Sequence, residues 1–176
     1  MTFPTGLTHL DGHGRARMVD VTGKPSTRRV AVARCSVQTS ADVAEVLADP
    51  SGGTDLIESA RWAGILAAKQ TSSLIPLCHP IRVDSVRIDI EAAPDGLHVT
   101  TTAGIDERTG VEMEALTGCA PAALVLVHAL LGPDPGTRID GLTLWHKSGG
   151  RSGTWTRGPS GTMRGPSGAR AAADRS

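Results

Sequence analysis

Three short islands of the sequence hold side chains that can move protons or bind an anion. They are LIPLCHP, TGVEMEALT and KSGGRSG, at residues 74–80, 109–117 and 147–153. The islands contribute His79, Glu112, Glu114 and Lys147. An imidazole, two carboxylates and a lysine are the groups expected of acid/base catalysis on a polar substrate.

Each island also has a plainer interpretation when it is taken alone. His79 could be a loop histidine with a structural hydrogen bond, and the acidic residues could complement the positive end of a helix. Glu112 and Glu114 diverge by about 200° on a regular helix and point the same way only on a strand or an entry turn. The glycine-rich island could be an exposed basic loop, although its free amides also suit a phosphate. The presence of all three islands in one chain favours a functional site.

The overall composition argues against several classes of function. With 18 basic and 18 acidic residues in 176, the chain carries no net charge that would attract nucleic acid or an acidic membrane. One Phe, three Trp and no Tyr are too few aromatic rings for a surface that stacks bases. The sequence has no apolar run of membrane-span length and no signal-peptide core. We therefore expect a soluble cytoplasmic protein without a nucleic-acid or membrane partner.

The three cysteines, Cys35, Cys78 and Cys119, have no paired spacing. We expect reduced thiols rather than disulfides, with Cys78 and Cys119 as small buried residues. A metal site built from Cys78, His79 and His128 has no supporting ligand spacing, so we expect no metal bound by the protein.

Hydrophobic periodicity predicts the elements that position these islands. Strands are expected at residues 28–38, 83–92, 97–105 and 139–146, with a hairpin turn at 94–96. Helices are expected from residue 39 or 40 to 48, at 55–70, and roughly at 112–131. Pro121 either kinks the last of these helices or moves its regular start to about residue 120. The small residues at helical spacing in 55–70 predict a close approach to another element.

This order of elements predicts an α+β sandwich, in which helices cover one face of a mainly antiparallel sheet. The length fits one domain, which we place at residues 1–156. Residues 157–176 contain RGPSG twice and have no apolar period, so we expect a disordered tail.

In content and order the three islands resemble the cyclic pyranopterin monophosphate synthases, the MoaC family of molybdenum cofactor biosynthesis. The match includes LTH at 7–9, MVDV at 18–21, Lys24, ARWAGI at 60–65 and AAK at 67–69. The resemblance implies a ferredoxin-like subunit that forms a hexamer from dimers, with an active site at each dimer interface. It also implies conversion of 3′,8-cyclo-7,8-dihydroguanosine triphosphate into cyclic pyranopterin monophosphate, with loss of pyrophosphate.

The resemblance assigns roles to particular residues. The catalytic positions are His79, Glu112, Glu114, Lys147 and His128. The positions expected to contact substrate are Lys24, Lys69, Cys78, Met113 and Arg151. No cofactor is implied with certainty, and Mg²⁺ could accompany a nucleotide phosphate.

The chain departs from the family pattern at three positions. Gly53 stands where the family has a lysine, and His128 and Leu131 stand where it has an aspartate and a lysine. These changes remove two cations and one anion from a site for a triphosphate, unless Lys24, Lys69 or Arg151 replaces a lost lysine. We expect a diverged cyclase acting on a 3′,8-cyclised guanosine nucleotide. The alternative is a non-catalytic paralogue that binds nucleotide or co-assembles with an active homologue.

Overall fold

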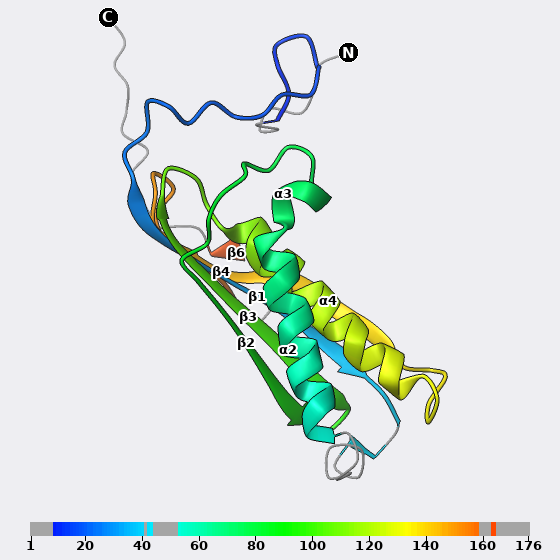
Figure 1. The fold of residues 1–176 in the computed structure, drawn as a ribbon. Helices are drawn as coiled ribbons and strands as arrows, with labels where there is room; N and C mark the ends of the chain where they lie inside the picture. Colours follow the sequence, from blue (N-terminus) through cyan, green and yellow to red (C-terminus); the bar gives the residue numbers. More distant parts are fainter. Residues whose placement is uncertain (1–8, 41, 44–52, 159–162, 165–176) are drawn as a thin grey trace, which may run out of the picture.

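Two long helices cover one face of a six-stranded sheet whose pairings are all antiparallel within the described residues (Figure 1). The computed structural model describes residues 9–40, 42–43, 53–158 and 163–164. The strands are β1 (Thr27–Gln38), β2 (Ser85–Ala93), β3 (Gly96–Glu107), β4 (Arg138–Ser148), β5 (Trp155–Arg157) and β6 (Met163–Arg164). The helices are α2 (Gly53–Lys69), α3 (Thr71–Leu74) and α4 (Glu112–Leu130).

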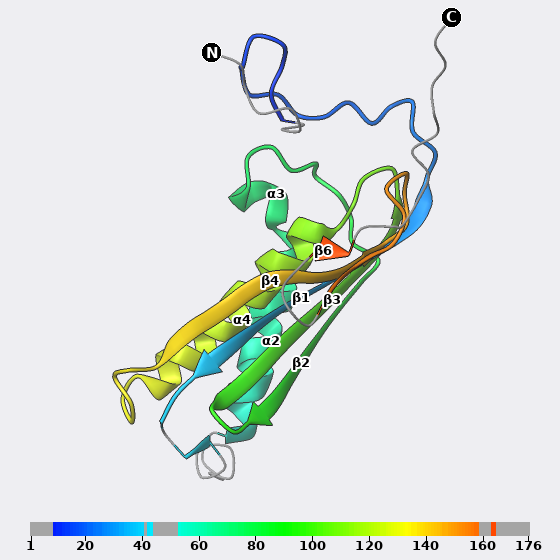
Figure 2. The same cartoon turned by 180° about the vertical axis from the view of Figure 1, so that it is seen from behind.

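The sheet has the order β2-β3-β1-β4-β5-β6, and its first four strands alternate along the chain with α2 and α4. That β-α-β-β-α-β arrangement is ferredoxin-like. Seen from behind in Figure 2, the other face of the sheet has no helix of the described residues over it. The predicted α+β class, with a mainly antiparallel sheet and helices on one face, is therefore confirmed.

The core forms because strand alternation turns small apolar side chains towards the helices. On β1, every second residue from Ala31 to Val37 is buried. The two helices approach closely where both lack side chains. A Cβ atom added to Gly64 of α2 would lie 2.5 Å from the carbonyl oxygen of Gly118 in α4. The close approach predicted for the small residues of 55–70 is thus a contact between α2 and α4.

The helix α4 is long and apolar enough to span a membrane, but half of its apolar stretch is buried within the subunit. It packs on α2 and on the central strands, so it is the core helix of a soluble fold. The helix continues without a break through Pro121. The alternative of a regular start near residue 120 is therefore wrong, because the helix already begins at Glu112.

Two segments predicted from the sequence lie largely outside the residues that the structure describes. The short helix expected up to residue 48 lies mostly there, since only residues 42–43 are described between 41 and 52. Most of the expected tail at 157–176 lies there too. The structure describes residues 157–158 and 163–164 of this tail. Arg157 and Met163–Arg164 take part in the pairing of β5 with β6, which was not expected from the sequence.

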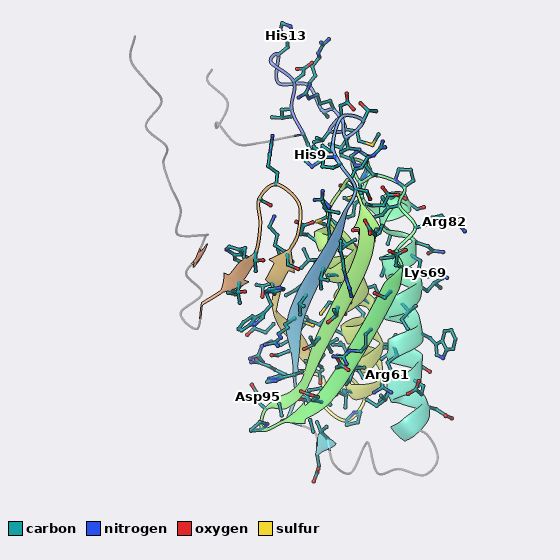
Figure 3. The ribbon with its side chains drawn as sticks, turned by 90° about the vertical axis from the view of Figure 1, so that its left-hand side faces the viewer. His9, His13, Arg61, Lys69, Arg82 and Asp95 are labelled. Atoms are coloured by element: carbon teal, nitrogen blue, oxygen red, sulfur yellow. The ribbon has the colours of Figure 1, made fainter. Side chains whose placement is uncertain are left out.

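The two ends of the sheet have different surroundings. At the proximal end, Thr27 of β1 pairs with Glu107 of β3, and α4 begins just beyond. At the distal end, Gln38 pairs with Gly96 and Arg138, and α4 ends just before β4. Figure 3 shows this separation, with His9 above the proximal end and Asp95 at the distal end.

Candidate active site

A cavity of about 150 Å³ lies at the proximal end, where the first two sequence islands meet. The segment after α3 forms one wall, and the entry to α4 forms the other. The cavity is lined by His9, Leu77, Cys78, His79, Ile81, Thr109, Gly110, Glu112, Met113 and Glu114. Three of the predicted catalytic residues and two of the predicted substrate contacts are thus brought together.

The third island joins the cavity through an ion pair. The ammonium of Lys147 donates to Oε1 of Glu112 at 3.0 Å, and both side chains are half-buried. Lys147 is placed by the sheet, because it pairs with Ala31 of β1, which is buried beneath the helices. Residues far apart in sequence, 79, 112 and 147, therefore meet at one end of the fold.

Glu114 is the most deeply buried of the titratable groups that line the cavity. The residue is 4% exposed. Burial, together with the smaller effect of the Glu112 charge, raises the pKa of its carboxyl to about 7, although a backbone hydrogen bond opposes the shift. A carboxyl with this pKa holds its proton for much of the time at neutral pH, so it is suited to donate one.

The two glutamates both line the cavity, although side chains two residues apart on a regular helix point in different directions. Glu112 is the first residue of α4 and turns outward to Lys147, whereas Glu114 turns inward, and both still border the space above the helix start. One carboxylate is paired with a cation, and the other is buried with no ion pair among the described residues. Such a contrast separates the protonation states of two neighbouring acids.

His79 is oriented by the chain segment that precedes β1. Its Nε2 lies 2.8 Å from the carbonyl oxygen of Val19. A carbonyl can only accept, so Nε2 carries the hydrogen, and a neutral His79 has its free lone pair on Nδ1. The structural and the functional interpretations of His79 are compatible, since they use different ring nitrogens.

The thiol of Cys78 also faces this cavity. Burial and the nearby charge of Glu114 raise its pKa, so the sulfur is held as a neutral thiol. Cys78 is only half-buried, which corrects the expectation of a small buried residue. Cys119 does fit that expectation, since it is fully buried with its sulfur 3.4 Å from that of Cys35.

Two of the predicted substrate contacts line a second hollow, and a third lines neither this hollow nor the proximal cavity. Lys24 and Arg151 line a larger space of about 640 Å³ together with Arg29. Lys69 is exposed in the last turn of α2 and lines neither space within the subunit (Figure 3).

Two residues that line these spaces, His9 and Arg29, were not expected there from the sequence. His9 belongs to the motif LTH, which the resemblance includes without a role for the histidine. Arg29 could have been found from strand alternation, which places it on the same face as Ala31.

The remaining candidate, His128, lies at the distal end of the subunit. It is 14 residues beyond Glu114 on the same helix, a distance of about 21 Å along the axis. Gly53 begins α2 and Leu131 follows α4, so the three positions that differ from the family pattern all lie at this end. Within one subunit, the structure does not bring His128 to Glu114.

No group of His, Cys, Asp or Glu side chains in the described ranges is arranged to hold a metal ion. The ionic contact at the proximal cavity is the pair of Lys147 with Glu112.

Comparison with known proteins connects this geometry to a family. The family model described as "MoaC family" matches residues 18–150. A protein of Mycobacterium tuberculosis named cyclic pyranopterin monophosphate synthase 2 is 46% identical over 154 residues, which are 86% of this chain and 91% of the relative. Proteins named cyclic pyranopterin monophosphate synthase from Novosphingobium aromaticivorans and Streptomyces coelicolor are 45% and 46% identical, over 85% and 86% of this chain and 96% and 89% of theirs. The match contains both glutamates, His79 and Lys147, and the chain belongs to the MoaC family.

Proposed function

We propose that the protein is a lyase of the cyclic pyranopterin monophosphate synthase type, acting on a 3′,8-cyclised guanosine nucleotide. Its product is cyclic pyranopterin monophosphate or a close relative of it. The observation that carries the proposal is the pair of unlike glutamates beside His79, one held by Lys147 and one buried with a raised pKa. The names of the relatives support the same reaction class.

The residues of the cavity divide the proton transfers of such a rearrangement. Opening a purine ring and closing a pterin ring both need a group that gives a proton and a group that takes one. Glu114 is the proton donor in this scheme, and Nδ1 of His79 is the acceptor. Lys147 supplies positive charge where negative charge develops, and Glu112 fixes its position. Cys78 and Met113 form the neutral part of the wall that the substrate contacts.

The proposed active site combines the proximal end of one subunit with the distal end of another. The distance of about 21 Å between Glu114 and His128 along α4 supports this arrangement, because one subunit cannot bring both to one substrate. It fits a homo-oligomer of dimers, a hexamer, with its active sites at dimer interfaces. Lys69 then contacts substrate across such an interface. Mg²⁺ belongs to the proposal only as a companion of the nucleotide phosphates.

The proposal includes divergence from the family pattern at the distal end. Gly53 and Leu131 offer no positive charge there, and His128 offers an imidazole in place of a carboxylate. A triphosphate bound at such an end lacks two charge-assisted hydrogen bonds, each worth roughly 1.5–3 kcal/mol. We expect slower turnover than in a relative with both lysines, in a cytoplasmic protein without a nucleic-acid or membrane partner.

The charge-poor distal end also favours a second candidate, a subunit that co-assembles with an active homologue. In a mixed dimer, the proximal end of this chain would meet the lysines and aspartate of the homologue. Turnover would then need both chains, and this chain alone would bind nucleotide without consuming it.

Two matched carboxylate variants test the proposal. Glu114→Gln removes the proton donor, whereas Glu58→Gln removes an exposed carboxylate that pairs with Arg61 on the outer surface of α2. We expect the rate at which the cyclised nucleotide is consumed, measured by mass spectrometry, to be at least 100-fold lower in the first variant. The rate should be unchanged in the second variant. Equal consumption by both variants would contradict the role of Glu114. Consumption by wild type only after a homologue is added would favour the second candidate.

A further inference from the structure

We propose that Cys35 and Cys119 form a modification site, at which a peroxide oxidises the two buried thiols to an intramolecular disulfide. Cys35 lies on β1, and Cys119 lies on α4, 84 residues further along the chain. Their sulfur atoms are 3.4 Å apart. Neither residue lines the acid/base cavity, and formation of the bond does not depend on the proposed function.

The fold already brings the two sulfur atoms close to bonding distance. A disulfide joins its sulfurs at about 2.05 Å, so the two atoms need to approach by roughly 1.4 Å more. The residues one turn before and after Cys119 on the same side of α4 are Ala115, Ala122 and Ala123, which are all buried. Because these side chains are single methyl groups, α4 lies close to β1 at this point, and no long side chain separates the sulfurs.

The hydrogen bond between the two thiols gives them different roles. Sγ of Cys119 donates to Sγ of Cys35, and this bond lowers the pKa of Cys35, although burial opposes the shift. The same hydrogen bond, together with burial, raises the pKa of Cys119. Cys35 is therefore the thiol that ionises and attacks an oxidant, and Cys119 is the second thiol.

The oxidation balances with one molecule of hydrogen peroxide. The Cys35 thiolate attacks one oxygen, the O–O bond breaks, and the released hydroxide takes up a proton, which gives water and a sulfenic acid. The sulfur of Cys119 then attacks the sulfur of Cys35, the S–O bond breaks, and the departing hydroxide takes the thiol proton of Cys119. The two thiols thus lose two electrons, and the peroxide is reduced to two water molecules.

Burial makes this site selective for small oxidants. Cys35 is 4% exposed and Cys119 is 0% exposed, so a reagent reaches them only through local opening of the core. Hydrogen peroxide is small and neutral, whereas a maleimide is much larger. Cys78, in contrast, is half-buried and lines the proximal cavity. In the folded protein, a maleimide should modify Cys78 and leave the pair of Cys35 and Cys119 for the peroxide.

The disulfide joins the two elements that position the acid/base site. Cys119 lies five residues after Glu114 on α4, and Cys35 lies four residues after Ala31, the partner of Lys147. A bond that draws α4 towards β1 changes the position of Glu114 relative to Lys147. This consequence rests on the proposed function. We expect the oxidised protein to consume the cyclised nucleotide about tenfold more slowly or less, and to recover on reduction.

Peroxide treatment of the full-length protein, followed by alkylation in denaturant and tryptic mapping without reductant, tests the site. Trypsin places Cys35 in peptide 35–61, Cys78 in peptide 70–82 and Cys119 in peptide 109–138. We expect peptides 35–61 and 109–138 to be joined, with the loss of two hydrogens, and to separate on addition of dithiothreitol. Cys119→Ala and Cys35→Ala should each abolish the joined peptides, whereas the matched variant Cys78→Ser should retain them. Circular dichroism checks that each variant is folded.

Urea unfolding gives a second readout of the same bond. Oxidised wild type should unfold at a midpoint higher by at least about 1 M than reduced wild type, because the bond closes a loop of 84 residues. Oxidised Cys119→Ala should show no such gain. Absence of the joined peptides, at a peroxide concentration that oxidises Cys78, would overturn the proposal, and so would joined peptides that persist in Cys119→Ala.

The outcomes separate this site from the proposed function. Joined peptides in a protein that consumes no cyclised nucleotide would support the site and contradict only the proposed function. In an active protein, dithiothreitol should restore the rate of oxidised wild type. An equal loss of rate in oxidised Cys119→Ala would overturn the effect of the disulfide on activity, since that variant still contains Cys78.

Discussion

Glu112 and Glu114 are two residues apart, yet they lie in very different environments. The first is half-exposed and pairs with a lysine, and the second is buried with a pKa of about 7. The sequence indicated both as candidates but gave no reason to distinguish them. The difference arises from the entry of α4, which directs one side chain towards β4 and the other beneath the cavity.

The raised pKa of Glu114 makes the stability of the fold depend on pH. The folded state holds the proton up to about pH 7, whereas the unfolded chain releases it near its ordinary value of 4.5. Between these values the folded state binds more protons, so the free energy of unfolding decreases as pH rises through this window. Glu114→Gln removes the ionisable group. The free energy of unfolding of the variant minus that of wild type should therefore be larger at pH 8 than at pH 4, by at most about 3 kcal/mol.

Urea unfolding of both proteins at the two pH values measures this difference. A variant that gains no stability relative to wild type between pH 4 and pH 8 would contradict the assignment of a buried, neutral carboxyl.

Lys147 should contribute much to activity and little to stability. Its ion pair with Glu112 is half-exposed, and such pairs contribute roughly 0–1 kcal/mol. We expect Lys147→Met to change the midpoint of urea unfolding only slightly and to lower kcat/KM for the cyclised nucleotide about 10²–10⁴-fold. Arg87→Met is the matched loss of a cation outside the site. A large loss of stability with unchanged kcat/KM would show that Lys147 is structural.

At the scale of elements, the close approach of α2 and α4 depends on glycine. Gly64→Val would place side-chain atoms against the carbonyl of Gly118 and against Ile88, since even a Cβ lies 2.5 Å and 2.2 Å from them. Overpacking of this kind costs roughly 1–3 kcal/mol. Thermal unfolding should show a clear decrease for this variant. Gly132→Ala, which meets nothing within 4 Å, should leave the midpoint nearly unchanged. Equal midpoints for the two variants would show that the helices can separate at no cost.

The elements could be predicted from the sequence where alternation or helical spacing was strong. β1 was expected at 28–38 and lies at Thr27–Gln38, and α2 was expected at 55–70 and lies at Gly53–Lys69. Short elements such as β5 have no period to detect, because three residues complete only one alternation. Pro121 suggested a break, but the packing of α4 on the sheet and on α2 retains the helix through it.

The site could be predicted only in part, because it depends on contacts that local sequence does not encode. The motifs indicated His79, Glu112, Glu114 and Lys147, and the fold brings these four together. The orientation of Arg29 depends on carbonyl groups 78 and 79 residues away. The tautomer of His79 depends on Val19, 60 residues away. Only the folded chain shows such long-range contacts.

At the scale of the whole molecule, the subunit carries the two halves of the proposed site at opposite ends. Restoring the family residues with Gly53→Lys, His128→Asp and Leu131→Lys should raise kcat/KM for the cyclised nucleotide by at least tenfold, because two cations return to the phosphate site. The measurement is initial rate by mass spectrometry, with the oligomer checked by light scattering. An unchanged rate in an intact oligomer would show that Lys24, Lys69 or Arg151 already replaces the lost lysines.

The most direct test of the proposed function is incubation of the purified full-length protein with enzymatically made 3′,8-cyclised GTP. Substrate loss and cyclic pyranopterin monophosphate are read by mass spectrometry, and the oxidised pterin by fluorescence, with the Streptomyces coelicolor relative as positive control. We predict that the nucleotide is consumed and a pterin is formed, more slowly than by the control. An intact substrate beside an active control would contradict the proposed activity.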